Sequence, residues 1–218
     1  MSQAPNPMTV ILDHPLVHHA LADLRDRHTP TSRFRHRARE LAKYLILEAT
    51  RDLETDPVDV ETVLGIAKGR TLGNRPIVVA PILRAGLAMV ESAMELLPEA
   101  EVRHIGLYRN ESSLTPVEYY VKLPDTYPPE TTVLIIDPML ATGGSLAAAI
   151  EFLFERGAEE VTAICILGTP EGIAAVRDGV GDRDVTLVLG ALDDGLDEHA
   201  YIVPGLGDAG DRLYGTVD

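Results

Sequence analysis

Four short, almost wholly apolar runs constrain the fold of this chain more than any other feature of its sequence. These runs are Ile77-Val-Val-Ala80, Val133-Leu-Ile-Ile136, Val161 to Leu167 and Val185-Thr-Leu-Val-Leu189. Such runs are typical of strands that are covered on both faces, as in parallel sheets. Helical patterns lie between them, at about 87–97, 145–156 and 171–177. Strands and helices that alternate at this spacing predict βαβ units and therefore an α/β fold with a parallel sheet.

Other patterns occur outside this alternation. Apolar residues repeat at helical spacing over about 13–27, where Asp13 is placed to cap a helix. They repeat again from near Ser32 to Ala49, and this second helix is expected to end before the turn-prone Thr55-Asp-Pro57. Residues 102–123 predict a long hairpin or arm, with a polar turn between two strands. The chain has 218 residues and no evident repeat or low-complexity linker, so we expect a single domain over residues 1–218.

Charge and composition exclude several classes of protein. Nineteen basic residues stand against 34 acidic ones, and the net charge of -15 opposes binding to nucleic acid or to anionic membranes. No apolar stretch reaches the roughly 18 residues of a membrane span, and the N-terminal residues lack the features of a secretory signal. Cys165 lies in an apolar run and is expected to be buried. We therefore expect a cytoplasmic protein with no nucleic-acid or membrane partner.

The segment most informative about function runs from Asp137 to Ser145. A buried strand ends at Asp137, glycines follow at 143 and 144, and Ser145 can cap a helix that begins at once. Unhindered N–H groups and the positive end of a helix dipole then converge, as a phosphate site requires. Asp137 is placed to accept hydrogen bonds from sugar hydroxyls or to lie near a metal, because ligands of open α/β sheets bind at this edge. On these residues alone, an ordinary strand-to-helix turn explains the segment equally well.

The string Asp137-Pro-Met-Leu-Ala-Thr-Gly-Gly-Ser145, below called the phosphate loop, resembles the phosphoribosyl pyrophosphate (PRPP) loop of the phosphoribosyltransferases. Its Asp137-Pro138 pair, where many members have two acids, is similar to the uracil phosphoribosyltransferase family. Further segments resemble that family in the same order: His14-Pro-Leu-Val17, Phe34-Arg35, Glu48 to Leu53, Pro81-Ile-Leu-Arg-Ala-Gly86, Tyr108-Arg-Asn110, Tyr119 to Leu123, Pro170-Glu-Gly172 and Pro204 to Gly210. Gly168-Thr169 and Asp197 depart from its pattern.

The resemblance implies a phosphoribosyltransferase-type central parallel sheet flanked by helices, with a β-hairpin arm and a hood formed by N- and C-terminal segments. It also implies site residues. Those expected to bind PRPP are Arg84, Arg109, Asp137, Pro138, Met139, Leu140, Ala141, Thr142, Gly143, Gly144, Ser145 and Asp208. Those expected to bind uracil are Ile202, Gly207, Asp208 and Ala209, in a stretch from 202 to 209 that we call the base segment. Asp208 is also the closest candidate for a catalytic general base.

The implied activity is the condensation of uracil with PRPP to give uridine 5′-monophosphate (UMP) and pyrophosphate, a step of pyrimidine salvage. Mg²⁺ is expected to bind mainly through the phosphates and hydroxyls of PRPP. GTP is a possible effector. Two alternatives stay open: a regulatory protein that senses PRPP or a nucleotide, and a phosphoribosyltransferase for another base.

The remaining polar clusters carry weaker signals. The histidines at 14, 18 and 19 lack a further ligand at useful spacing, so we expect no metal site built from the protein alone. The acids Asp193, Asp194, Asp197 and Glu198 are interpreted as a solvated turn. Apolar residues in the 102–123 hairpin predict a homodimer or higher homo-oligomer in which this arm reaches a second subunit.

Overall fold

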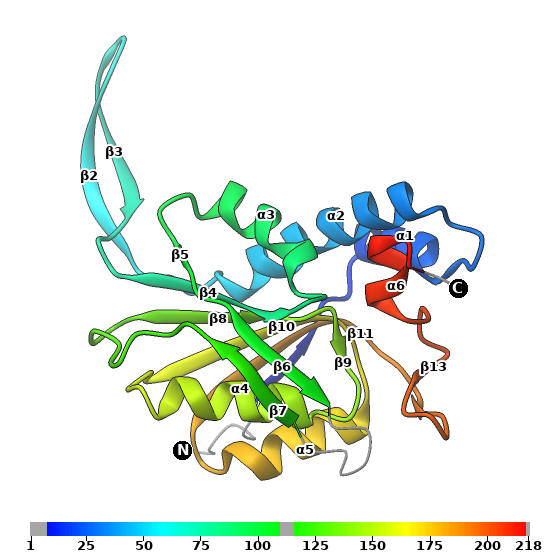
Figure 1. Ribbon diagram of the computed structural model, residues 1–218. Helices are drawn as coiled ribbons and strands as arrows, with labels where there is room; N and C mark the ends of the chain where they lie inside the picture. Colours follow the sequence, from blue (N-terminus) through cyan, green and yellow to red (C-terminus); the bar gives the residue numbers. More distant parts are fainter. Residues whose placement is uncertain (1–7, 110–115, 217–218) are drawn as a thin grey trace.

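A computed structural model describes residues 8–109 and 116–216 and places a central sheet between two layers of helices (Figure 1). The main path of the sheet has the strand order β1-β11-β10-β8-β4-β6-β7. All neighbours on this path are parallel except β6 and β7. The strands of the sheet are β1 (Met8–Ile11), β4 (Ile77–Leu83), β5 (Glu101–Val102), β6 (Ile105–Arg109), β7 (Pro116–Val121), β8 (Thr132–Ile136), β9 (Met139–Leu140), β10 (Glu160–Gly168) and β11 (Asp184–Leu192).

The four apolar runs become the adjacent strands β4, β8, β10 and β11 at the middle of this sheet. Their inner residues are buried because helices cover both faces, which confirms the predicted parallel α/β fold. The buried thiol of Cys165 lies in β10, as expected. Strand β1 was not predicted. It has only four residues, lies at the sheet edge, and pairs with β11 through Thr9 and Leu187.

Helices α1, α2, α3 and α6 pack on one face of the sheet, and α4 and α5 pack on the other (Figure 1). Their bounds are α1 (Pro15–Arg25), α2 (Thr31–Ala49), α3 (Leu87–Leu96), α4 (Gly144–Phe154), α5 (Pro170–Val180) and α6 (Ala209–Tyr214). The five predicted helices are confirmed, and α2 ends at Ala49, before Thr55, as expected. His14, not Asp13, caps α1, because its Nδ1 accepts a hydrogen bond from Leu16 N–H at 3.1 Å.

A projecting hairpin arm is present, as expected, but residues 55–72 form it and not residues 102–123. The predicted hairpin is present as β6 and β7, which pair antiparallel, yet β6 also pairs with β4, so this hairpin extends the edge of the sheet. The hairpin that projects is β2 (Thr55–Thr62) with β3 (Gly65–Leu72), a separate two-stranded sheet (Figure 1). Its two exposed strands of eight residues each carry few apolar residues in a row, so no strong strand signal marks them in the sequence.

The predicted hood is present at one end of the sheet. Residues of α1, α2 and α6 share a hydrophobic core with the short β12 (Gly195–Leu196) and β13 (Ile202–Val203), which pair antiparallel. Figure 1 shows α6 and β13 at the same end of the sheet as β9, on the far side of the molecule from the β2–β3 hairpin. The C-terminal chain therefore lies over the carboxyl edge of the parallel strands.

Candidate active site at the carboxyl edge of the sheet

Adjacent strands bring Arg84 and Asp137 to the same edge. Strands β4 and β8 are paired, with Pro81 opposite Ile136, so the residues that follow them leave the sheet side by side. Gly86 makes this approach close: a Cβ atom there would lie 2.5 Å from the carbonyl oxygen of Ile136. The chain therefore needs glycine at 86 to hold the turn after β4 against the end of β8.

The carboxyl group of Asp137 lies in an environment that disfavours its charge. Burial raises its pKa to about 7, and one hydrogen bond from Met139 N–H, at a long 3.4 Å, partly offsets this effect. The backbone of Asp137 is fixed, since its N–H donates to the Ile164 carbonyl at 3.1 Å. A buried carboxyl group with so few donors can accept hydrogen bonds from a ligand's hydroxyl groups.

The phosphate loop presents the N-terminus of α4. Gly143 is the N-cap residue with φ +77°, a left-handed conformation that favours glycine, and no side chain caps the helix. In the part of the chain that the structure describes, the N–H groups of Thr142 and Gly143 donate no hydrogen bond. Free N–H groups and the dipole of an 11-residue helix make this loop suited to a phosphate group.

The side chain of Thr169, at the start of α5, also holds the phosphate loop in place. The buried hydroxyl of Thr169 donates to the Ala141 carbonyl at 2.7 Å and accepts from Gly172 N–H at 2.9 Å, so it also caps α5. The approach is tight, since a Cβ at Gly143 would lie 2.5 Å from the Gly172 carbonyl oxygen. Because a peptide is planar, holding the Ala141 carbonyl toward α5 directs the Thr142 N–H away from it. In the sequence, Thr169 stands out only as a departure from the family pattern.

The two arginines expected to bind PRPP lie on the turn after β4 and at the end of β6. Arg84 is exposed, and among the described residues no hydrogen bond or ion pair uses its guanidinium group. Its backbone carbonyl accepts a hydrogen bond from the Tyr214 hydroxyl at 3.1 Å, which ties α6 to the turn after β4. Arg109 is the last residue of β6, next to β4 in the sheet, and its side chain lies outside the described part of the structure.

The base segment presents main chain more than side chains. Ile202 and Ala209 are 6% and 5% exposed and their side chains pack in the hydrophobic core. Gly207 is exposed with φ +82°, and the exposed Asp208 caps α6 by accepting a hydrogen bond from Asp211 N–H at 2.9 Å. Peptide N–H and C=O groups are therefore what this segment offers to a ligand.

The interpretation of Asp193 as part of a solvated turn is wrong. This residue is 6% exposed and forms an ion pair with Arg25 of α1, whereas Asp194, Asp197 and Glu198 are exposed as expected. The arginine lies 168 residues away in the sequence, so no local pattern indicated the pair.

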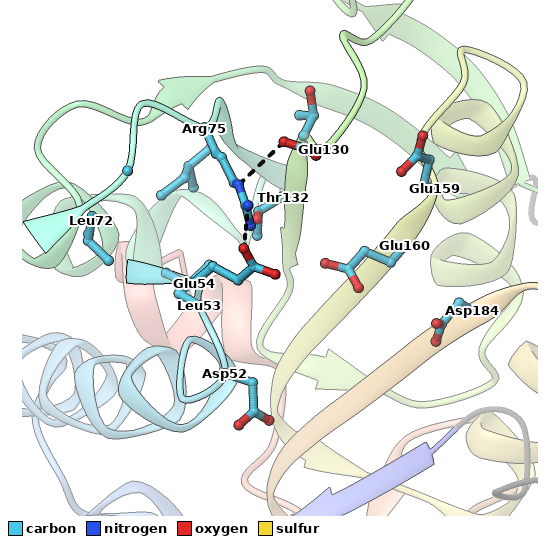
Figure 2. Close-up of a pocket in the computed structure, with 13 residues that line it drawn as sticks. Asp52, Leu53, Glu54, Leu72, Arg75, Glu130, Thr132, Glu159, Glu160 and Asp184 are labelled. Atoms are coloured by element: carbon cyan, nitrogen blue, oxygen red, sulfur yellow. Dashed lines mark ion pairs between the residues drawn. The ribbon is translucent and has the colours of Figure 1, made fainter. Parts of the chain in front are cut away.

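The opposite, amino edge of the sheet carries a different hollow of about 480 Å³ (Figure 2). Acidic side chains dominate its lining, namely Asp52, Glu54, Glu130, Glu159, Glu160 and Asp184. Figure 2 shows Arg75 between Glu54 and Glu130, with which it forms ion pairs. Neighbouring carboxylates repel phosphates, so this hollow does not suit PRPP. Within residues 8–109 and 116–216, no group of three acidic, His or Cys side chains is arranged to hold a metal ion.

Comparison with known proteins agrees with this geometry. A model of the family described as uracil phosphoribosyltransferase matches residues 10–216. The uracil phosphoribosyltransferase of Leifsonia xyli is 53% identical over 95% of this chain and 98% of its own length. That of Dictyoglomus turgidum is 48% identical over 96% of this chain and its whole length. The solved structure of the AQ2163 protein from Aquifex aeolicus superposes with a TM-score of 0.87 at 36% identity, covering 95% of this chain and 98% of that one.

In none of the helices that the structure describes is there a stretch long and apolar enough to cross a membrane. The family match spans the strands, the phosphate loop and the base segment alike. The chain belongs to the uracil phosphoribosyltransferase family.

Proposed function

We propose that this protein transfers the phosphoribosyl group of PRPP to uracil, giving UMP and pyrophosphate. One observation carries the proposal: open N–H groups at the start of α4, the poorly solvated carboxyl group of Asp137 and the exposed Arg84 lie at the same edge of the sheet, at the end of the molecule where β13 and α6 also lie (Figure 1). Phosphate, ribose hydroxyls and a nucleobase are the chemical groups that such a set can bind together.

Different residues of the site have different roles in the proposed reaction. A ring nitrogen of uracil forms a bond to the anomeric carbon of ribose while the bond from that carbon to a pyrophosphate oxygen breaks. The N–H groups of the phosphate loop bind a phosphate group, and Asp137 accepts hydrogen bonds from ribose hydroxyls. Arg84 and Arg109 stabilise the negative charge on the departing pyrophosphate. The nitrogen loses a proton, and Asp208 is the carboxylate of the base segment that is proposed to accept it.

Mg²⁺ fits the residues at this edge as an ion that PRPP carries into the site. The structure offers Asp137 at the start of the loop, and among the described residues it has no group of three carboxylate, His or Cys side chains arranged to hold a metal ion, whereas Mg²⁺ keeps several waters and binds phosphate oxygens readily. When bound, the ion neutralises charge on the pyrophosphate leaving group. The side chain of Asp137 is the protein group placed to bind it, directly or through water.

A regulator that senses PRPP would not need a base site. The main chain of residues 202–209 lies at the same end of the sheet as the phosphate loop (Figure 1). This placement supports the enzyme over that alternative, and it supports uracil over cytosine. Cytosine presents a ring acceptor and an exocyclic donor where uracil has a donor and an acceptor, so two partners would be left unpaired at about 1–3 kcal/mol each.

The decisive experiment measures product formation from PRPP and Mg²⁺ with uracil, cytosine, hypoxanthine and guanine. UMP formation with uracil alone is expected. Gly207→Val should abolish uracil use while leaving PRPP binding, measured by calorimetry, largely intact, because a β-branched residue does not adopt φ +82° readily. PRPP binding by wild type without turnover of any base would support the sensor, and turnover of another base would reassign the substrate.

We propose further that the protein acts in the cytoplasm and that GTP is an effector, both as the family resemblance implies. Initial rates at subsaturating PRPP, with and without GTP, test the second point. Equal rates would contradict it.

We also propose a homo-oligomer, now through the β2–β3 hairpin. Its tip carries Val63 and Leu64, which are 100% and 97% exposed, and Ile66 is 65% exposed. Apolar side chains on a free hairpin are stabilised when a partner covers them. Light scattering should give a dimer or larger species for wild type and a smaller one for the double variant Val63→Asp, Leu64→Asp. A wild-type monomer of 23.6 kDa would contradict the proposal.

A further inference from the structure

We propose that the ion pair between Arg25 and Asp193 is a positioning device that sets the main-chain geometry of the base segment and so controls the affinity for uracil. The inference rests on the proposed function, in which residues 202–209 receive the base. Neither residue is expected to touch substrate. Both act through the peptide groups of Gly205.

The pair holds both peptide groups that flank Gly205. The carboxylate of Asp193 accepts hydrogen bonds from Arg25 Nη1 and Nη2 at 2.8 and 2.5 Å, and from the N–H of Gly205 at 2.9 Å. Arg25 Nη1 also donates to the carbonyl of Gly205 at 2.8 Å. One charged group therefore binds the N–H of this residue and the oppositely charged group binds its C=O. Since peptides are planar, this fixes the orientation of the chain on each side of Gly205.

Gly205 has no freedom to compensate for a lost contact. Its φ is +62°, and a Cβ atom at this position would overlap the carbonyl oxygen of Ile202. The residue is thus packed against the start of the base segment, two residues before Gly207. A change at the ion pair is transmitted to Gly207 through a short, tight turn.

The pair also connects this turn to the rest of the site. The N–H of Asp193 donates to the Gly168 carbonyl at 2.9 Å, directly before Thr169, which holds the phosphate loop. On the other side, Arg212 donates to the carbonyl of Leu206 at 2.7 Å and to those of Leu24 and Asp26 at the end of α1. The end of α1 and the turn at 205 and 206 are therefore joined through two arginines.

Stability alone is a poor explanation for the pair. Asp193 is almost fully buried and Arg25 about three-quarters buried, and removing such charges from water offsets most of their attraction. Apolar contacts already join α1 to the core through Val17, Ala20, Leu21 and Leu24. What the pair adds is directional: a planar guanidinium and a carboxylate specify where two peptide groups point.

The test compares Asp193→Asn and Arg25→Lys with two matched controls. Asp23→Asn removes a carboxylate from α1, the helix that carries Arg25. The ion-pair partners of Asp23 are Arg33 and Arg37 of α2, and neither belongs to the base segment. Asp194→Asn removes the exposed neighbour of Asp193. For each purified full-length protein, kcat and the KM values for uracil and PRPP are measured, along with PRPP affinity by calorimetry and thermal melting.

We expect Asp193→Asn to raise the KM for uracil about tenfold or more, with the KM and affinity for PRPP within about twofold of wild type. Arg25→Lys keeps the charge but loses the two-pronged contact, so it should give an intermediate rise. Both controls should keep the wild-type KM for uracil. If Asp193→Asn fails to fold, Arg25→Lys decides on the same criteria.

The outcomes separate this inference from the function on which it rests. Wild type that does not use uracil overturns the proposed function. Wild type that uses uracil, with pair variants that keep its KM or raise the KM values of both substrates equally, overturns only the positioning role. A rise in the KM for uracil that Asp23→Asn reproduces also overturns it, because the effect would then come from a general weakening of α1.

Discussion

The phosphate loop and the base segment are both glycine-containing turns of the proposed site, yet they are held in different ways. Main-chain contacts with α5 and the buried Thr169, 28 residues along the chain, hold the phosphate loop. Arginines hold the base segment, one of them 168 residues away from its partner. The phosphate loop is therefore held by residues at the start of α5, whereas the supports of the base segment include Arg25, which lies 180 residues from Gly205 in the sequence. Changes to the loop should affect PRPP, and changes to the supports of the segment should affect uracil.

The largest effect on activity is expected from Gly143→Ala in the phosphate loop. A Cβ at this position meets the Gly172 carbonyl at 2.5 Å and imposes an unfavourable φ, so the start of α4 must shift. We expect kcat/KM for PRPP to fall more than a hundredfold, which corresponds to about 3 kcal/mol of transition-state stabilisation.

A matched control exists at Gly157, which has φ +84° but no atom closer than 3.7 Å to the place that a Cβ would occupy. Gly157→Ala should cost about 1 kcal/mol of stability and leave PRPP kinetics unchanged. Steady-state rates and urea unfolding on both variants check this. Equal kinetic losses would show that the loop has no special requirement for a close approach.

Asp137→Asn should separate activity from stability. Turnover is expected to fall about ten- to a hundredfold, because a charged hydrogen bond to ribose is worth roughly 1.5–3 kcal/mol. The folded pKa of about 7 lies above the ordinary aspartate value of 3.8, so the folded protein binds more protons between these pH values. Wild-type stability should thus decrease as pH rises from about 4 to 7, by at most about 1.4 kcal/mol per pH unit.

The asparagine variant lacks this titration. It should therefore unfold at a higher temperature than wild type at pH 8, while the two converge near pH 4. Thermal melts across this range and initial rates at pH 8 provide the measurement. A variant that keeps full activity, or whose melting temperature relative to wild type does not change with pH, would remove Asp137 from its proposed role.

The distance along the sequence between a segment and the residues that hold it explains how much of the molecule could be predicted from the sequence. The central strands and the turn into α4 could be predicted because apolar runs and a glycine-rich turn act over a few residues, whereas the interpretation of that turn as a phosphate loop came from the family resemblance. The buried state of Asp193 was not, since it depends on Arg25 arriving from the other end of the chain. The projecting hairpin was assigned to residues 102–123 because their apolar strands have the stronger local signal, although β4 pairs with that hairpin.

Thr169→Val should have a smaller effect on the phosphate loop. Valine keeps the shape but removes the hydroxyl that binds the Ala141 carbonyl and caps α5. A lost cap costs about 1 kcal/mol of stability, and the freed loop carbonyl should raise the KM for PRPP about fivefold. Thr169→Ser, which keeps the hydroxyl, should restore most of both properties. If serine behaves like valine in the kinetic assay, packing and not the hydrogen bond holds the loop.

The smallest effect is expected at the amino edge of the sheet, where a change should affect neither the phosphate loop nor the base segment. Glu160 and Asp184 are partners in the register of β10 and β11, so two like charges stand side by side at the acidic hollow of Figure 2. Glu160→Lys replaces repulsion by attraction and should stabilise the fold by about 0.5 kcal/mol, with Glu160→Gln giving about half of that. Because both side chains are exposed, the gain should fade in 0.5 M salt, where the Debye length is only about 4 Å. Urea unfolding at two salt concentrations measures it, and the KM values for PRPP and uracil should stay within about twofold of wild type. A change in either KM would mean that the two edges of the sheet are coupled, and the loop and the base segment could then no longer be treated as the separable parts of the site.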